Sequence, residues 1–306
     1  MAFTAADVKT LREMTGVGMM DCKKALTASD GDMDKAVEWL REKGMAASAK
    51  KAGRIAAEGM AYADVIDGVG VVIEVNAETD FVGKNEKFVD FVHGVAATVA
   101  KENPADLDAL MACKYAGGEN TVLQQQQEMV LVIGENIKVR RFARFADGVS
   151  VSYVHAGGKI GVLVNLETNL PAEKVLTAGK DVAMQIAALN PRFWDKSQVS
   201  DDVLAEEKKI MLAQMDNDPK MAGKPAQVKE KIVMGKMNKF YAENCLLQQE
   251  FVKDNSTTVG AYLEASAKAL GGEIKFKNAV RFEKGEGIEK KQENFAAEIA
   301  SLVKGS

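Results

Sequence analysis

Residues 60–75 of the chain have the sequence MAYADVIDGVGVVIEV, and the pattern of this segment is the strongest indication of the fold. Apolar residues dominate 60–66 and 69–75, and the dipeptide Asp67-Gly68 separates the two runs. Asp-Gly is a strong signal for a two-residue hairpin turn, because both central positions of that turn need a positive φ. The stretch therefore predicts two antiparallel strands joined by a tight turn.

A helix and a third strand are predicted after this hairpin, and the same set of elements recurs further along the chain. The two sets are predicted at 60–66, 69–75, 85–101 and 137–145, and then at 149–155, 159–166, 171–189 and 274–282. Gly70-Val71-Val72-Ile73 in the first set resembles Gly161-Val162-Leu163-Val164 in the second. Two similar subdomains, each a small antiparallel sheet with helices on one face, explain this order better than a parallel sheet. The sequence thus predicts an α+β fold.

The first 44 residues predict a small module of three helices. Thr4 and Asp7 form a capping box for the first helix, Asp32 caps the third, and Gly44 is expected to end it. Three short helices around one small core are the arrangement of ubiquitin-associated domains. Residues 45–58 are small, locally basic and without an apolar face, which is typical of a linker.

Met19 and Met20 fall in a predicted loop at residues 16–20. Two interpretations are open: the methionines fill the small core, or they form a polarizable docking surface for a partner. Two adjacent loop positions do not both point easily into so small a core, which favours docking.

Residues 201–245 predict an inserted pair of antiparallel helices. Apolar residues recur at helical spacing on both sides of a break at 216–219, and methionines lie at the expected seam. We expect this coiled-coil hairpin to be an arm for a partner or for dimerisation. The predicted division of the chain is a helical module at 1–44, a linker at 45–58, core subdomains at 59–145 and at 146–200 with 246–282, the hairpin at 201–245, and a C-terminal module at 283–306.

The composition excludes several classes of function. A net charge of −4 over 306 residues provides no basic field for wrapping nucleic acid, and two histidines cannot build a histidine metal centre. Three cysteines without a Cys-x-x-Cys spacing indicate free thiols in a reducing compartment. The start of the chain has no signal-peptide pattern, and no apolar run approaches the roughly 20 residues that span a bilayer. We therefore expect a cytoplasmic protein.

No arrangement of residues in the sequence predicts catalysis. The chain has no Gly-x-x-x-x-Gly-Lys-Ser/Thr loop for phosphate and no Gly-x-Ser-x-Gly motif for a serine nucleophile. We expect a binding protein with no catalytic residues, no cofactor and no metal ion, rather than an enzyme.

The most distinctive polar segment is EVNAETDFV at residues 74–82, which follows the second predicted strand. Two interpretations of Phe81 are open. In one, Phe81 lies in the core of a strand-to-helix corner that Thr79 or Asp80 caps. In the other, Phe81 protrudes as an interface anchor beside a carboxylate.

Two segments resemble the signatures of the bacterial elongation factor Ts family. The sequence LREMTGVGMMDCKKAL at residues 11–26 is similar to the N-terminal signature of that family, and residues 74–82 are similar to its second signature. The resemblance extends over essentially the whole chain. One departure is His155-Ala156, which stands where the family usually has a His-Gly pair.

The resemblance implies a translation elongation factor that acts by nucleotide exchange. It implies binding to elongation factor Tu, GDP-bound and nucleotide-free, and a disturbance of the Mg²⁺ and phosphate site there, so that GDP leaves and GTP can rebind. By the same resemblance, the residues that contact the partner are Thr79, Asp80, Phe81 and Val82 at the Mg²⁺ site, Leu11, Arg12, Met19, Met20 and Lys23 on the N-terminal module, and His155 in the second subdomain.

Two alternatives remain open. One is a small-molecule enzyme that uses scattered carboxylates, which would need a large pocket lined by convergent titratable groups, and we expect no such pocket. The other is a non-catalytic adaptor whose N-terminal module recognises peptides, with a core that is merely structural. Such an adaptor would have no effect on the release of a nucleotide. A homodimer through the helical hairpin is a further expectation, whereas direct contact with nucleic acid or with a membrane is not expected.

Overall fold

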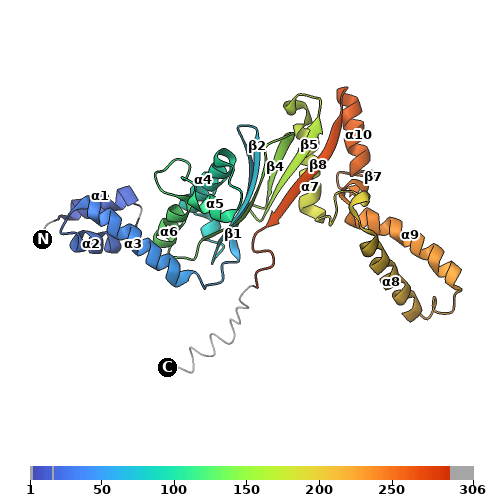
Figure 1. The fold of residues 1–306 in the computed structure, drawn as a ribbon, viewed down its shortest axis with the longest axis horizontal. Helices are drawn as coiled ribbons and strands as arrows, with labels where there is room; N and C mark the ends of the chain where they lie inside the picture. Colours follow the sequence, from blue (N-terminus) through green and yellow to red (C-terminus); the bar gives the residue numbers. More distant parts are fainter. Residues whose placement is uncertain (1–2, 16, 290–306) are drawn as a thin grey trace.

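The structure is a computed structural model that describes residues 3–15 and 17–289. Two three-stranded antiparallel sheets lie against each other at its centre, and helices cover the outer face of each sheet (Figure 1). This arrangement of helices and small antiparallel sheets confirms the predicted α+β fold. None of the described helices is long and apolar enough to cross a membrane.

The first sheet has the strand order β1-β2-β3, with β1 at Glu58–Ile66, β2 at Val69–Ala77 and β3 at Lys138–Phe145. The hairpin predicted at Asp67-Gly68 is confirmed, and the φ angles of these two residues are 51° and 80°. The central strand β2 is buried along nearly its whole length, because α-helices cover one of its faces and the second sheet covers the other.

The second sheet has the order β4-β5-β8, with β4 at Val149–His155, β5 at Ile160–Thr168 and β8 at Ile274–Glu283. Its register repeats that of the first sheet: Gly70 of β2 lies opposite Phe145, and Gly161 of β5 lies opposite Phe282. The β-bulge after Glu74 in β2 also recurs at the equivalent point of β5. The predicted internal repeat is therefore confirmed, down to the position of this bulge.

Small residues allow the two sheets to approach closely. The Ala61 N–H donates to the Gly158 carbonyl oxygen at 2.8 Å, and a Cβ added to Gly161 would lie 3.1 Å from the Ala61 carbonyl carbon. The buried residues of the apolar cluster between the sheets are Ala61, Ala63, Val72, Leu163 and Phe282. A larger side chain at position 161 would push the sheets apart, because protein interiors are close-packed.

Three helices cover the first sheet, namely α4 at Glu86–Glu102, α5 at Leu107–Ala112 and α6 at Val122–Ile133. The inner face of α4 buries the residues that its spacing predicts, namely Phe88, Phe91, Val92, Val95 and Val99. The second sheet is covered by α7 at Ala172–Leu189 and α10 at Val259–Leu270. The short elements nearby are β6 at Glu250–Phe251, β7 at Asp254–Thr258, η2 at Lys196–Gln198 and η3 at Leu246–Gln248.

The N-terminal helices are α1 at Ala5–Thr15, α2 at Met19–Ala28 and α3 at Met33–Lys51. The predicted capping box at Thr4 and Asp7 and the predicted cap at Asp32 are confirmed. The prediction that Met19 and Met20 lie in a loop is wrong, since they form the first turn of α2. Val17 and Gly18 lie between the two helices, as the predicted loop requires, and Gly16 lies outside the described part of the chain.

Helix α3 does not end at Gly44, as the sequence predicts, but continues to Lys51. Gly44 lies against α6, where an added Cβ would be 3.2 Å from the Gln127 carbonyl oxygen. Glycine at this position serves the close approach of two helices rather than a helix end. Residues 45–51 are consequently helical rather than an irregular linker, and Ala47 packs against the core of the first sheet.

Helices α8 at Asp201–Asn217 and α9 at Ala226–Asn244 form a hairpin that projects from the second sheet (Figure 1). The predicted methionine seam is confirmed, since Met215 and Met237 are buried between the two helices. Met234 lies on the outside of the hairpin and is exposed.

The chain after β8 crosses the start of β1. Gly285 has a φ of 71°, and a Cβ there would lie 2.0 Å from the Ala57 carbonyl oxygen. Lys284 pairs with Glu58 at 2.6 Å. The predicted C-terminal module at 283–306 lies mostly outside the described residues, which end at residue 289.

Replacing Ala156 by glycine should raise the free energy of unfolding by about 0.5–1 kcal/mol. Ala156 has a φ of 48° in the turn between β4 and β5, where the Cβ of an L-residue crowds the backbone. Denaturation by urea, followed by circular dichroism, measures the difference. The control is Ala28→Gly, at the exposed end of α2, which should lower stability because glycine disfavours helix. Equal losses at both positions would exclude strain at Ala156.

Candidate partner-binding site at the end of strand β2

The chain leaves β2 at Ala77 and reaches α4 through a turn at residues 78–81 and the 3-10 helix η1 at Val82–Lys84. A Cβ added to Gly83 would lie 3.0 Å from the Gly59 carbonyl oxygen, so η1 packs closely against the start of β1. Asn85 then begins α4, since its side chain accepts a hydrogen bond from the Lys87 N–H at 3.0 Å. Ordered structure thus holds the turn on both sides.

Phe81 protrudes from this turn and is 79% exposed. The interpretation that Phe81 belongs to the core is therefore wrong. A ring this exposed makes little contribution to the stability of the free chain. It is available to an apolar pocket of another molecule, which is how aromatic anchor residues act at interfaces.

The other residues predicted at this site differ in exposure. Thr79 and Asp80 are exposed beside Phe81. Val82 is only 5% exposed and belongs to the core of the first sheet. The prediction that Val82 contacts a partner directly needs correction, because a buried side chain anchors the turn and has almost no surface for a partner.

Two carboxylates join the turn at 78–81 to the turn after α6. The Glu135 Oε2 accepts hydrogen bonds from the N–H groups of Glu78 at 3.0 Å and Thr79 at 2.9 Å, and its Oε1 accepts one from the Thr79 hydroxyl at 2.6 Å. In return, the Glu78 carboxylate accepts one from the Asn136 N–H at 2.6 Å. Charge-assisted hydrogen bonds of this kind are stronger than neutral ones.

The C-terminal end of α3 joins the same cluster. Lys51 Nζ donates to the Gly134 carbonyl oxygen at 2.5 Å, and Arg54 Nη1 lies 3.4 Å from Glu78 Oε1. The Asn136 side chain donates to the Arg54 carbonyl oxygen at 2.8 Å. Burial, followed by the charge of Arg54, lowers the pKa of Lys51. The N-terminal helices are therefore connected to the turn at 78–81 through α3.

A second group of predicted contact residues lies on α1 and α2. Arg12, Met19, Met20 and Lys23 are exposed, and Met20 and Lys23 line a shallow depression on α2. The interpretation of the two methionines as core residues is therefore wrong. Leu11 also needs correction, because it is fully buried among the three helices and cannot reach a partner.

His155 lies apart from both groups, at the exposed end of β4 in the second sheet. Its Nδ1 is 2.9 Å from the Tyr153 hydroxyl oxygen, and this hydrogen bond orients the ring. The predicted contact residues thus form three separate places on the chain: the turn after β2, the surface of α1 and α2, and the end of β4.

Comparison with known proteins identifies the family. A family model described as Elongation factor TS matches residues 78–286. The chain is 50% identical to the elongation factor Ts of Trichlorobacter lovleyi, and the alignment covers 99% of both chains. It is 47% identical to that of Clostridium kluyveri, over 99% of both chains, and 45% identical to that of Magnetococcus marinus, over 100% of both. The chain belongs to the elongation factor Ts family.

Membership of the elongation factor Ts family identifies a translation elongation factor, as the two sequence signatures imply. The family model begins at Glu78, so the turn that carries Phe81 lies inside the matched region. Helices α1–α3 lie before it, but the alignments to full-length relatives include them.

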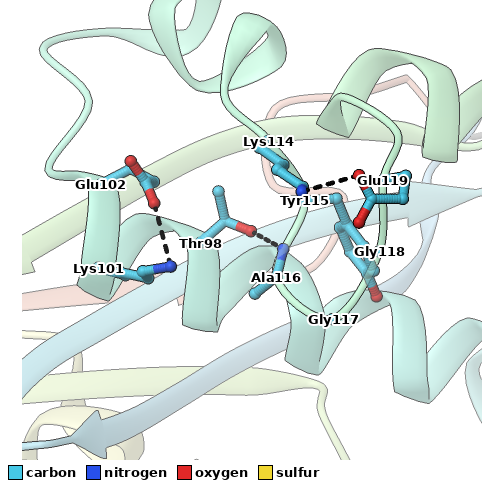
Figure 2. Close-up of a pocket in the computed structure, with 9 residues that line it drawn as sticks. All are labelled: Thr98, Lys101, Glu102, Lys114, Tyr115, Ala116, Gly117, Gly118 and Glu119. Carbon is cyan, nitrogen blue, oxygen red and sulfur yellow. Dashed lines mark hydrogen bonds and ion pairs between the residues drawn. The ribbon is translucent and has the colours of Figure 1, made fainter.

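A pocket in this member of the elongation factor Ts family lies between α4 and the loop that follows α5 (Figure 2). Lys101 lies 3.7 Å from Glu102, and Lys114 lies 2.9 Å from Glu119, so each lysine that lines the pocket has a glutamate partner. Burial raises the pKa of Tyr115 to about 12. Among the described residues, no three or more His, Cys, Asp or Glu side chains gather into a group that could hold a metal ion.

Sequence reasoning missed the role of Glu74, which is fully buried in β2. Its carboxylate accepts hydrogen bonds from Arg140 at 2.9 Å, Arg141 at 2.5 Å and the Gly285 N–H at 2.7 Å. A carboxylate inside an apolar strand is a signal for buried partners, because burying an unpaired charge is costly. That signal does not say which cations supply the pairing.

Sequence reasoning also missed Glu135, for a different reason. Glu135 lies 57 residues after Glu78 and 56 residues after Thr79 in the chain. In the sequence, a single Glu after a helix is most simply interpreted as a solvated surface residue, and no local pattern distinguishes Glu135 from other surface glutamates.

Proposed function

We propose that this chain binds elongation factor Tu and promotes the release of GDP from it, so that GTP can rebind. The observation that carries the proposal is the exposed Phe81 on an ordered turn, in a chain that belongs to the elongation factor Ts family. Such a factor works where translation takes place, in the cytoplasm.

An exchange factor needs no catalytic group of its own. If it binds nucleotide-free elongation factor Tu more tightly than the GDP-bound form, it lowers the affinity of elongation factor Tu for GDP by the same factor. Mg²⁺ and the phosphate contacts contribute much of the affinity of such GTPases for nucleotide. A side chain that displaces either one is therefore an efficient way to speed release.

The turn at 78–81 has the properties that this role requires. Phe81 would enter an apolar pocket of elongation factor Tu, while Asp80 would alter the charge around Mg²⁺. Thr79 would lie beside them. Val82, which is buried, would act by anchoring the turn in the core.

The N-terminal helices would supply a second contact with elongation factor Tu, and His155 a third. Arg12, Met19, Met20 and Lys23 present mixed apolar and basic groups on one exposed part of α1 and α2. Polarizable methionine side chains adapt well to a protein surface. In the division of the chain that we propose, these helices are a ubiquitin-associated-like module.

The hairpin of α8 and α9 is proposed to be a coiled-coil arm that contacts another protein molecule. Its seam is already closed by Met215 and Met237, so exposed residues such as Met234 are the ones available to a partner. For a homodimer through this arm, light scattering should give twice the 33.0 kDa mass of the chain, and Met234→Asp should return it to the monomer value. A monomer mass for the unmodified chain would exclude the homodimer and leave the arm to elongation factor Tu.

The test of the exchange function uses elongation factor Tu loaded with fluorescent GDP and chased with excess GDP. We expect this chain to increase the rate at which fluorescence is lost, in proportion to its concentration until the partner is saturated. An unchanged rate, with a stable complex still formed, would instead favour the adaptor that recognises a peptide through its N-terminal helices.

A further inference from the structure

The position of the Phe81 ring is not fixed by packing, because the ring is exposed and makes few contacts within the chain. The strand pairing of β2 ends at Ala77, so Glu78 and Thr79 lie beyond the described register with β1 and β3. Both N–H groups, together with the Thr79 hydroxyl, donate to one carboxylate, that of Glu135. One side chain from the turn after α6 thus accepts hydrogen bonds from three donors that lie within three residues of Phe81.

We propose that Glu135 is a positioning residue for nucleotide exchange, which holds the turn at 78–81 in its binding conformation before the partner arrives. This inference rests on the proposed function. Glu135 would act through Phe81 and would not itself touch the nucleotide site.

Preorganisation gives such a residue a measurable effect. A turn that is mobile in the free chain must be ordered when the complex forms, and fixing each residue lowers the affinity. Without the Glu135 carboxylate, Glu78 and Thr79 lose their shared acceptor. The buried side chain of Val82 still anchors the end of the turn in the core. We therefore expect the affinity for elongation factor Tu during exchange to fall, while the chain still folds.

Three substitutions distinguish positioning by hydrogen bonds from an effect of the negative charge of Glu135. In Glu135→Gln, the amide oxygen can accept both N–H groups, and the amide nitrogen can donate to the Thr79 hydroxyl. In Glu135→Asp, the negative charge stays, but the side chain is one methylene shorter and cannot reach all three donors. Glu135→Ala removes the acceptor entirely.

The experiment measures GDP release from elongation factor Tu at several concentrations of each full-length variant, together with its melting temperature. We expect Glu135→Ala to need about tenfold more protein for half-maximal exchange, with Glu135→Asp intermediate and Glu135→Gln within about threefold of the unmodified chain. The control Glu119→Ala, at an exposed residue in the loop of Figure 2, should leave exchange unchanged.

A double-mutant cycle with Phe81→Ala identifies the route of action. If Glu135 acts by positioning Phe81, Glu135→Ala should have little further effect on exchange once Phe81 is alanine. Equal effects in both backgrounds, or a Glu135→Asp variant that is better than Glu135→Gln, would overturn the proposal. If Phe81→Ala alone leaves exchange unchanged, the proposed function of the turn fails instead, whatever Glu135 does. If Glu135→Ala has a much lower melting temperature than the unmodified chain, the exchange activities of Glu135→Asp and Glu135→Gln are compared instead to test the positioning role.

Discussion

Replacing Phe81 by alanine is expected to slow the release of GDP from elongation factor Tu by about thirtyfold or more, while the melting temperature of the chain barely changes. The ring is 79% exposed, so the free chain has little packing to lose. In the complex, a buried aromatic anchor commonly contributes about 2 kcal/mol or more, which is equivalent to that change in rate.

The neighbouring Phe88 provides a matched control for this prediction. Phe88 is the same residue type seven positions later, but it is fully buried in α4 against the first sheet. Phe88→Ala should cost about 3–5 kcal/mol of stability through lost burial and a cavity. The two variants therefore have opposite expected results in the fluorescent GDP assay and in thermal denaturation. A large fall in melting temperature for Phe81→Ala, with exchange preserved per folded molecule, would refute the role of the exposed ring.

Replacing Glu74 by alanine should lower the free energy of unfolding by about 3 kcal/mol. The variant leaves Arg140, Arg141 and the Gly285 N–H without their shared acceptor in a buried region. Breaking a buried ion pair by removing one partner typically costs about 3–5 kcal/mol. We expect the lower end of that range, because the side chains of Arg140 and Arg141 are 26% and 31% exposed and keep some hydration.

Urea denaturation measures this loss, and hydrogen exchange locates it. The Gly285 amide should exchange faster in Glu74→Ala, because Glu74 Oε1 is its acceptor. Glu119→Ala removes an exposed ion pair with Lys114 and should change stability by less than about 1 kcal/mol. If the two glutamate variants lost similar amounts of stability, the buried cluster would not be the stabilising feature that its geometry indicates.

Local sequence patterns predicted the elements of the core well. The turn at Asp67-Gly68, the cap at Asp32 and the apolar face of α4 all depend on neighbours within about one turn of helix or hairpin. The repeat of the two sheets was also visible, because Gly70 and Gly161 begin similar apolar runs. These features require only backbone preferences and the period of apolar residues.

Several of the predictions that failed depended on how segments pack against one another. Gly44 has the residue type of a helix end, but it lies against α6, and the helix continues through it. Leu11 and Val82 fall in signature segments beside exposed residues, yet both side chains pack into cores. Phe81 is the opposite case, a large apolar residue that the fold leaves outside.

Local residue patterns established the α+β class, the β-hairpins, the starts of α1, α3 and α4, and the family, because each of these depends on residues that are close in the chain or on long matching segments. The folded arrangement was needed to show which apolar residues are exposed and which carboxylates are shared between segments. Burial of Glu74 and the hydrogen bonds of Glu135 join positions that are far apart in sequence. Such pairings follow from how helices and sheets pack in three dimensions, and no local pattern of residues specifies that packing.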